Sequence, residues 1–171
     1  MSRIRTYREA DAPAVIRIFR QFMAELTPVH LEREFGAYVE TAVREELSRI
    51  PAYYLGKPGQ GFWVAEADDA VVGMTGVERH SGTEAELRRM AVDAGYRRRG
   101  IGSELLHAAE GFCRERGYRM IILSTAEFQV AAMRLYEKHG YQRVRTEIAQ
   151  ARSHKTVGAG VTRYHYEKLL N

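Results

Sequence analysis

A short stretch in the middle of the chain, residues 87–106, constrains the fold more than any other. An apolar segment ends at Val92, and a basic, glycine-containing loop leads directly into the periodic apolar pattern of a helix. The first N–H groups of a helix have no backbone partner and lie at the positive end of its dipole, so they bind phosphate well. The stretch therefore predicts a site for a pyrophosphate-bearing cofactor. Its loop residues are Arg97, Arg98, Arg99, Gly100, Ile101, Gly102 and Ser103.

The rest of the chain alternates between short strand patterns and longer helix patterns. Strands are predicted at residues 4–7, 62–67, 71–78, 84–92, 120–123, 141–148 and 162–169. Helices are predicted at residues 11–26, 31–50, 100–117 and 129–139, and residues 51–61 are predicted as a loop rich in glycine and proline. Hairpin-spaced strands combined with helical crossovers indicate an α/β sandwich with a mixed sheet rather than a purely parallel Rossmann sheet. The continuous apolar run at 120–123 predicts a strand covered on both faces.

Composition excludes several classes of protein. A length of 171 residues predicts a single domain, residues 1–171, and a charged share of 28% is that of an ordinary globular protein. No apolar run is long enough to cross a bilayer, and the polar N-terminus does not resemble a signal peptide, so we expect a cytoplasmic protein without membrane attachment. The single cysteine, Cys113, suits a reducing compartment. The net charge of +4 fits nucleic acid, an anionic cofactor or an anionic substrate equally well.

Two ordered blocks resemble the GNAT superfamily of acetyl-CoA-dependent N-acetyltransferases. The first is Arg97, Gly100 and Gly102, which match the family's Arg/Gln-x-x-Gly-x-Gly/Ala pattern directly after a strand. The second is residues 129–141, QVAAMRLYEKHGY, where many members have Asn at the position of Gln129. The resemblance implies a GNAT-like fold, with a central, mostly antiparallel twisted sheet of six to seven strands flanked by about four helices. It also implies acetyl-CoA as cosubstrate.

Gln129 together with the FWVAE segment at residues 62–66 is similar to the camello-like branch, which includes acetyltransferases of cysteine S-conjugates. Those relatives carry a hydrophobic membrane segment before that strand. Here the equivalent region is the charged helix predicted at 31–50, so membrane attachment is not carried over.

The resemblance also implies where the cosubstrate binds. The pantetheine arm would pair with the backbone of the strand before the loop, and the loop would hold the pyrophosphate. The strand residues assigned to cofactor contact are Met90, Ala91 and Val92, and those of the second block are Gln129, Ala132 and Tyr136. The competing interpretations are core packing for the apolar residues and a solvated basic run for the three arginines.

Two residues are candidates for the chemistry of acetyl transfer to an amine. Glu86 matches a position that some family members use as the base, and Tyr136 matches the residue that assists the departing thiolate. Strict alternation would place Glu84, Glu86, Arg88, Met90 and Val92 on one face of their strand. Glu86 could equally be an ion-pair partner of Arg88 or Arg89, with Glu78 and Glu66 as rival bases.

Other residues receive more ordinary interpretations. Cys113 is expected in the core rather than as a nucleophile, and the six histidines show no metal-ligand spacing. An aromatic set lies where the family builds its acceptor pocket: Phe35, Tyr38, Tyr53 and Tyr54.

A small-molecule amine acceptor is favoured over a protein, no nucleic-acid partner is expected, and a homodimer is compatible with the sequence. The alternatives left open are a protein lysine or N-terminal acetyltransferase and a non-catalytic acyl-CoA-binding domain. A nucleic-acid-binding module would need a basic patch away from the loop.

Overall fold

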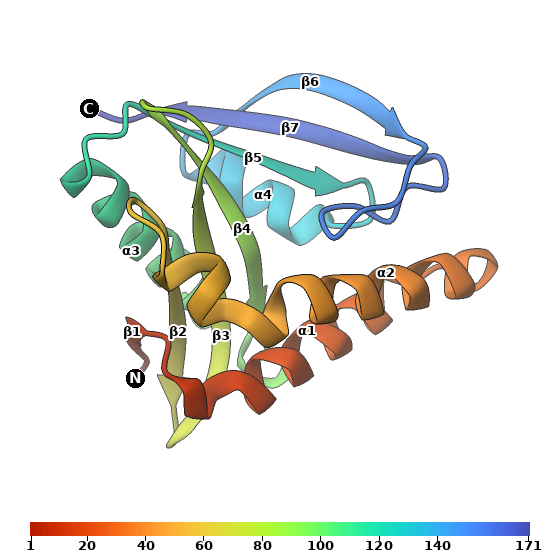
Figure 1. Cartoon of the computed structure of the whole chain (residues 1–171), viewed down its shortest axis with the longest axis horizontal. Coiled ribbons are helices and arrows are strands. Elements are labelled where there is room, and N and C mark those ends of the chain that lie inside the picture. The colour runs from red at the N-terminus through yellow and green to blue at the C-terminus, as the bar shows by residue number, and fades with distance from the viewer.

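The protein forms one seven-stranded mixed sheet with helices on both faces, as described by a computed structural model of residues 1–171 (Figure 1). The strand order is β1-β2-β3-β4-β5-β7-β6. The strands are β1 (Arg3–Thr6), β2 (Gly61–Ala67), β3 (Ala70–Arg79), β4 (Glu84–Val92), β5 (Met120–Ala126), β6 (Gln142–Ala149) and β7 (Val161–Leu169). The α-helices are α1 (Ala12–Leu26), α2 (Glu32–Glu45), α3 (Ile101–Glu115) and α4 (Val130–Lys138). The predicted mixed, mostly antiparallel sheet with four main helices is confirmed.

The helices divide the hydrophobic core into layers. Helices α1 and α2 bury their apolar faces against one side of β2–β4, and the core there includes Phe19, Phe62 and Met74. Helix α3 covers the opposite side of the same strands, and α4 packs beneath β5 and β7 (Figure 1). No helix combines the length and the apolar composition required to cross a bilayer.

The sheet opens between β4 and β5, its one parallel pair. These strands are paired only over Glu84–Glu86 against Met120–Ile122, whereas the pairing of β4 with β3 extends from Ala85 to Val92. Beyond Glu86 the two strands diverge, so β1–β4 and β5–β7 run in different directions (Figure 1). The divergence leaves one backbone edge of β4 without a neighbouring strand over its C-terminal half.

A β-bulge interrupts β4 at the same place. The register against β3 shifts between Arg88 and Ala91, and Arg89 has a positive φ of 58°. An extra residue in one strand changes the phase of the side chains that follow it. Met90 and Val92 consequently pack towards α3, and the predicted common face with Glu86 is wrong.

Three local predictions also differ from the structure. The helix predicted at 31–50 is a 3₁₀ turn at Val29–Leu31, then α2, then a second 3₁₀ turn at Leu47–Arg49. The loop predicted at 51–61 contains a π-helical turn at Pro51–Leu55. Strand β5 is fully buried on one face only, because Ile121 and Leu123 are buried whereas Met120 and Ile122, which alternate with them, are partly exposed.

Candidate active site

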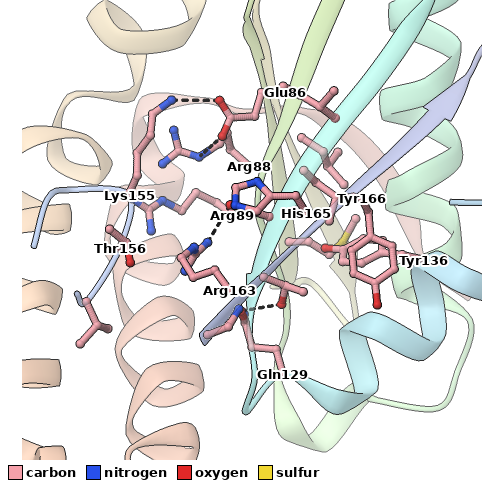
Figure 2. Close-up of a pocket in the computed structure, with 18 of the residues that line it drawn as sticks. Glu86, Arg88, Arg89, Gln129, Tyr136, Lys155, Thr156, Arg163, His165 and Tyr166 are labelled. Carbon is pink, nitrogen blue, oxygen red and sulfur yellow. Dashed lines mark hydrogen bonds and ion pairs between the residues drawn. The ribbon is translucent and has the colours of Figure 1, made fainter. Parts of the chain in front are cut away.

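A cavity of about 540 Å³ lies at the opening between β4 and β5 and is lined by residues from both faces of the sheet. Its wall includes residues of α1, α2, β4, β5, α4, β6, β7 and the segment between β6 and β7 (Figure 2). Five predicted site residues line it: Glu86, Met90, Ala91, Gln129 and Tyr136. The polar lining residues that we did not predict as site residues include Arg88, Arg89, Lys155, Thr156, Arg163 and His165. Val92, the basic loop and Ala132 lie outside this cavity.

Glu86 faces the cavity from β4 and forms an ion pair with Lys155, at 2.9 Å between carboxylate and ammonium. Its second carboxylate oxygen lies 4.0 Å from Nε of Arg88, so the predicted ion-pair interpretation also holds. The rival bases are placed differently. Glu66 binds Arg5 at 2.6 Å, and Glu78 binds Arg88 at 2.7 Å; neither lines the cavity. Of the three carboxylates, only Glu86 is positioned to reach a molecule in the cavity.

A fully buried carboxylate, Glu46, supports this wall from behind. It accepts hydrogen bonds from Arg88 (3.0 Å), Arg89 (2.6 Å) and the hydroxyl of Tyr54 (2.8 Å). Burial alone would raise the pKa of Glu46, but the charges of Arg89 and Arg88 outweigh it and lower the pKa from 4.5 to about 2. Arg89 also donates to the hydroxyl of Tyr38 at 2.7 Å. The side-chain hydrogen bonds of Arg89 to Glu46 and Tyr38 therefore hold this residue in its positive-φ conformation.

Tyr136 lies on the opposite side of the cavity from Lys155 and Glu86 (Figure 2). Its ring is buried against Tyr141 and Tyr166, at centroid distances of 5.7 and 6.3 Å. Burial raises the pKa of the Tyr136 phenol, so the hydroxyl stays protonated at neutral pH. The two predicted catalytic residues thus face one cavity, and the protonated hydroxyl of Tyr136 is available there as a hydrogen-bond donor.

The basic loop precedes α3 and follows a 3₁₀ turn at Ala94–Tyr96. Gly100 is the residue before the helix and is left-handed, with a φ of 85°. Gly102 packs under α4: a Cβ there would lie 3.2 Å from Leu135. This geometry fits the predicted anion site, because it presents the first N–H groups of α3 without side chains above them.

All three arginine side chains of this loop are exposed. Arg97 is nevertheless anchored, since it donates to the carbonyl of Val92 (3.0 Å) and binds Glu25 of α1 (2.6 Å). The guanidinium of Arg99 stacks over Tyr96, and Arg98 has a left-handed backbone. The exposure of all three fits the solvated basic run that competes with the binding interpretation, so phosphate binding here would depend mainly on backbone N–H groups.

Gly100→Ala is expected to lower the free energy of unfolding by about 1 kcal/mol, because a left-handed backbone disfavours a Cβ. No atom lies near the added methyl, so strain of the backbone is the only cost. The variant should also bind CoA more weakly. Urea unfolding and calorimetric titration with CoA measure the two effects. Gly111→Ala, in the middle of α3 and equally open, is the control and should raise stability by about 0.5–1 kcal/mol. Equal CoA affinity in the two variants would contradict the assignment of Gly100 to the anion site.

The second predicted block positions the start of α4. Gln129 precedes the helix, and its side-chain oxygen accepts from the hydroxyl of Thr125 (2.6 Å) and the backbone N–H of Ala126 (2.7 Å). Its amide therefore secures the end of β5. Ala132 is partly buried against the α3–α4 core. Ser103 is bonded to His139 at 2.9 Å, which connects the start of α3 to the end of α4.

The remaining predictions concern cysteine and the aromatic set. Cys113 is buried in the α3 core, and burial raises its pKa to about 12, which suits a structural thiol. Phe35 and Tyr38 line the cavity. Tyr54 is instead fully buried behind it, and Tyr53 binds Glu78. Two of the four predicted aromatic residues thus line the cavity, and the other two lie outside its lining.

Comparison with known proteins decides the family. The model of the acetyltransferase (GNAT) family matches residues 19–141, more than two thirds of the chain. The chain belongs to the GNAT acetyltransferase family. This GNAT protein is 33% identical over 138 residues to the probable N-acetyltransferase camello of Xenopus tropicalis, covering 80% of this chain and 63% of that one. It is 37% identical over 108 residues to the N-acetylaspartate synthetase of Xenopus tropicalis, covering 63% and 40%.

The GNAT chain therefore spans between two fifths and two thirds of the length of these two relatives. A solved structure, PaiA N-acetyltransferase from Thermoplasma acidophilum in complex with coenzyme A, has a TM-score of 0.78 at 19% identity over 99% of both chains. That similarity shows the fold. The family is the one that the two sequence blocks resemble.

Proposed function

We propose that this GNAT protein transfers the acetyl group of acetyl-CoA to the primary amine of a small acceptor by direct attack in a ternary complex. The observation that carries the proposal is that Glu86 and Tyr136 face one cavity beside the divergence of β4 and β5. The free backbone edge of β4 suits the amide groups of the pantetheine arm, and the start of α3 suits the pyrophosphate. When bound, acetyl-CoA supplies the acetyl group as a thioester.

Glu86 is the group that would remove the proton from the attacking amine. An alkylamine with a pKa of ~10.4 is unprotonated in only about one molecule in a thousand at neutral pH, a cost of roughly 4 kcal/mol. A carboxylate can accept that proton directly or through water. Lys155 and Arg88 hold the Glu86 side chain in place.

A thiol-release assay tests the proposal directly. The purified chain is incubated with acetyl-CoA and a panel of alkylamines, amino acids, S-substituted cysteines and lysine peptides, and free CoA is measured. We expect saturable release with at least one small amine, and less release with the peptides. Tight CoA binding without release on any acceptor would replace the proposal with a non-catalytic acyl-CoA-binding domain.

Tyr136→Phe is expected to lower kcat about 10- to 100-fold while changing CoA affinity little, because a donor to the developing thiolate charge is lost. No protein group bonds to this hydroxyl, so the free energy of unfolding should hardly change. Tyr141→Phe is the matched control: its hydroxyl bonds to buried Glu110 at 3.2 Å, away from the cavity. That variant should lose stability and keep its kcat. Steady-state kinetics on a slow amine separates the cases, and an unchanged kcat in Tyr136→Phe would remove the role.

A further inference from the structure

Arg163 of β7 is the cation in the cavity wall that has no carboxylate partner. Its guanidinium donates a hydrogen bond to the hydroxyl of Ser124 at 2.8 Å and forms no ion pair. The other cationic side chains of the wall do form ion pairs. These are Arg88 with Glu46 and Glu78, Arg89 with Glu46, Lys155 with Glu78 and Glu86, and Arg145 with Glu147.

The charges around Arg163 leave it uncompensated. Three cations and three carboxylates balance in the network of Glu46, and Glu147 is already bonded to Arg145 at 2.8 Å. Burial lowers the pKa of His165, so that neighbour is neutral at neutral pH. Glu167 is four residues further along β7, about 13 Å away at the rise of a strand. The cavity therefore carries one positive charge without a partner.

Arg163 is also placed to bind something in the cavity. Its side chain is partly buried, and Figure 2 shows its guanidinium beside Arg89, with Gln129 beyond it. Burial lowers the pKa of Arg163, yet a guanidinium remains protonated in proteins. A partly desolvated cation gains most from an anion that replaces its lost water, and a carboxylate matches the guanidinium fork with two hydrogen bonds.

We propose that Arg163 binds a carboxylate of the acceptor, which makes the acceptor an amino acid or an amino-acid conjugate rather than a simple amine. The inference rests on the proposed function for the reaction itself. It extends that function because it names the group that recognises the acceptor. Apolar aromatic side chains from α1, α2 and the end of β5 form the rest of the wall and suit an apolar substituent: Phe19, Phe22, Phe35 and Phe128.

The test compares acceptors that differ only in the carboxylate. S-benzyl-L-cysteine is assayed beside its α-carboxamide, with thiol release as the readout. We expect kcat/KM to favour the acid about 10- to 100-fold, the range of a charge-assisted hydrogen-bonding pair. Arg163→Gln should abolish this preference through the KM of the acceptor, leaving the KM of acetyl-CoA unchanged, and Arg163→Lys should keep part of it. Arg152→Gln, on the exposed segment before β7, is the control with an unchanged preference.

Calorimetric titration of the same acid and amide into the CoA-loaded chain gives a second readout that needs no turnover. Binding of the acid that depends on Arg163, without thiol release, would support the anchor and refute the proposed acetyl transfer. Equal kcat/KM for acid and amide in the wild-type chain would overturn the inference while leaving acetyl transfer intact. A preference that survives Arg163→Gln, or a variant that changes only the KM of acetyl-CoA, would also overturn it.

Discussion

Glu86→Gln is expected to lower kcat about 100-fold or more at neutral pH, which is the range lost when a positioned base is removed. The substitution keeps the shape of the side chain and removes its negative charge, and with it the ability to accept a proton and the ion pair with Lys155. Lys155 remains attached to the wall, because Glu78 also binds it, at 3.2 Å. The segment that closes the cavity should therefore stay in place, and the loss of rate reports on proton transfer rather than on a displaced loop.

The pH dependence of kcat in Glu86→Gln further distinguishes a loss of proton transfer from a displaced loop. Without Glu86 the amine must lose its proton to solvent, so the rate of the variant should rise with pH towards the pKa of the amine and recover part of the deficit. Rates are measured by thiol release at saturating substrate. Glu84→Gln, two residues away on the same strand and 3.9 Å from His80, is the control and should keep its kcat. Full activity in Glu86→Gln would assign proton removal to another group.

Glu46→Gln is expected to lower the free energy of unfolding by about 3–5 kcal/mol, because it leaves Arg88 and Arg89 buried with too little negative charge. For a chain of this size that corresponds to a decrease in Tm of roughly 10 °C. Glu45→Gln, the adjacent and half-exposed carboxylate on α2, is the control and should change stability by less than about 0.5 kcal/mol. Urea unfolding at neutral pH measures both.

The sign of the pH effect follows from the pKa of Glu46, which is lower in the folded state, about 2, than its ordinary value of 4.5. The unfolded chain therefore binds the proton first as the pH falls. The contribution of Glu46 is complete above pH 4.5 and disappears as the pH approaches 2, so the wild-type advantage over Glu46→Gln should shrink across that interval. A difference that stays constant from neutral pH to pH 3 would contradict the buried ion pair.

Much of the architecture could be predicted, because it depends on local patterns. The strand, loop and helix around Gly100 follow from apolar periodicity and from glycine at a helix start, and the second block follows from the same kind of pattern. The bulge in β4 could not be read from alternation. It depends on Arg89, whose side chain reaches Glu46 and Tyr38 in a helix about fifty residues earlier in the chain.

The cavity wall was predicted only in part, because it too depends on contacts between residues that are distant in the sequence. Arg163 and Lys155 act through neighbours that are distant in sequence, and nothing in their local pattern distinguishes them from surface cations. Glu46 did carry a signal: it lies four residues after Ala42 and seven after Val39, on the apolar face of the second predicted helix. A buried carboxylate needs a buried cation as its partner, and here the partners are the adjacent Arg88 and Arg89 of β4.

The divergence of β4 from β5 has a consequence for how this chain meets other chains. An unpaired strand edge usually lies at the rim of a sheet, where it can recruit a strand from a second molecule. Here an unpaired edge also lies inside the sheet, between its two halves and beneath the helices of both faces (Figure 1). A narrow, extended molecule with amide groups can form hydrogen bonds along this edge of β4, whereas a folded protein is too large to enter the opening. The free backbone edge of β4 is therefore accessible to small ligands but not to a strand of another chain. Only the terminal strands β1 and β6 have edges at the rim of the sheet, where pairing with another chain could occur.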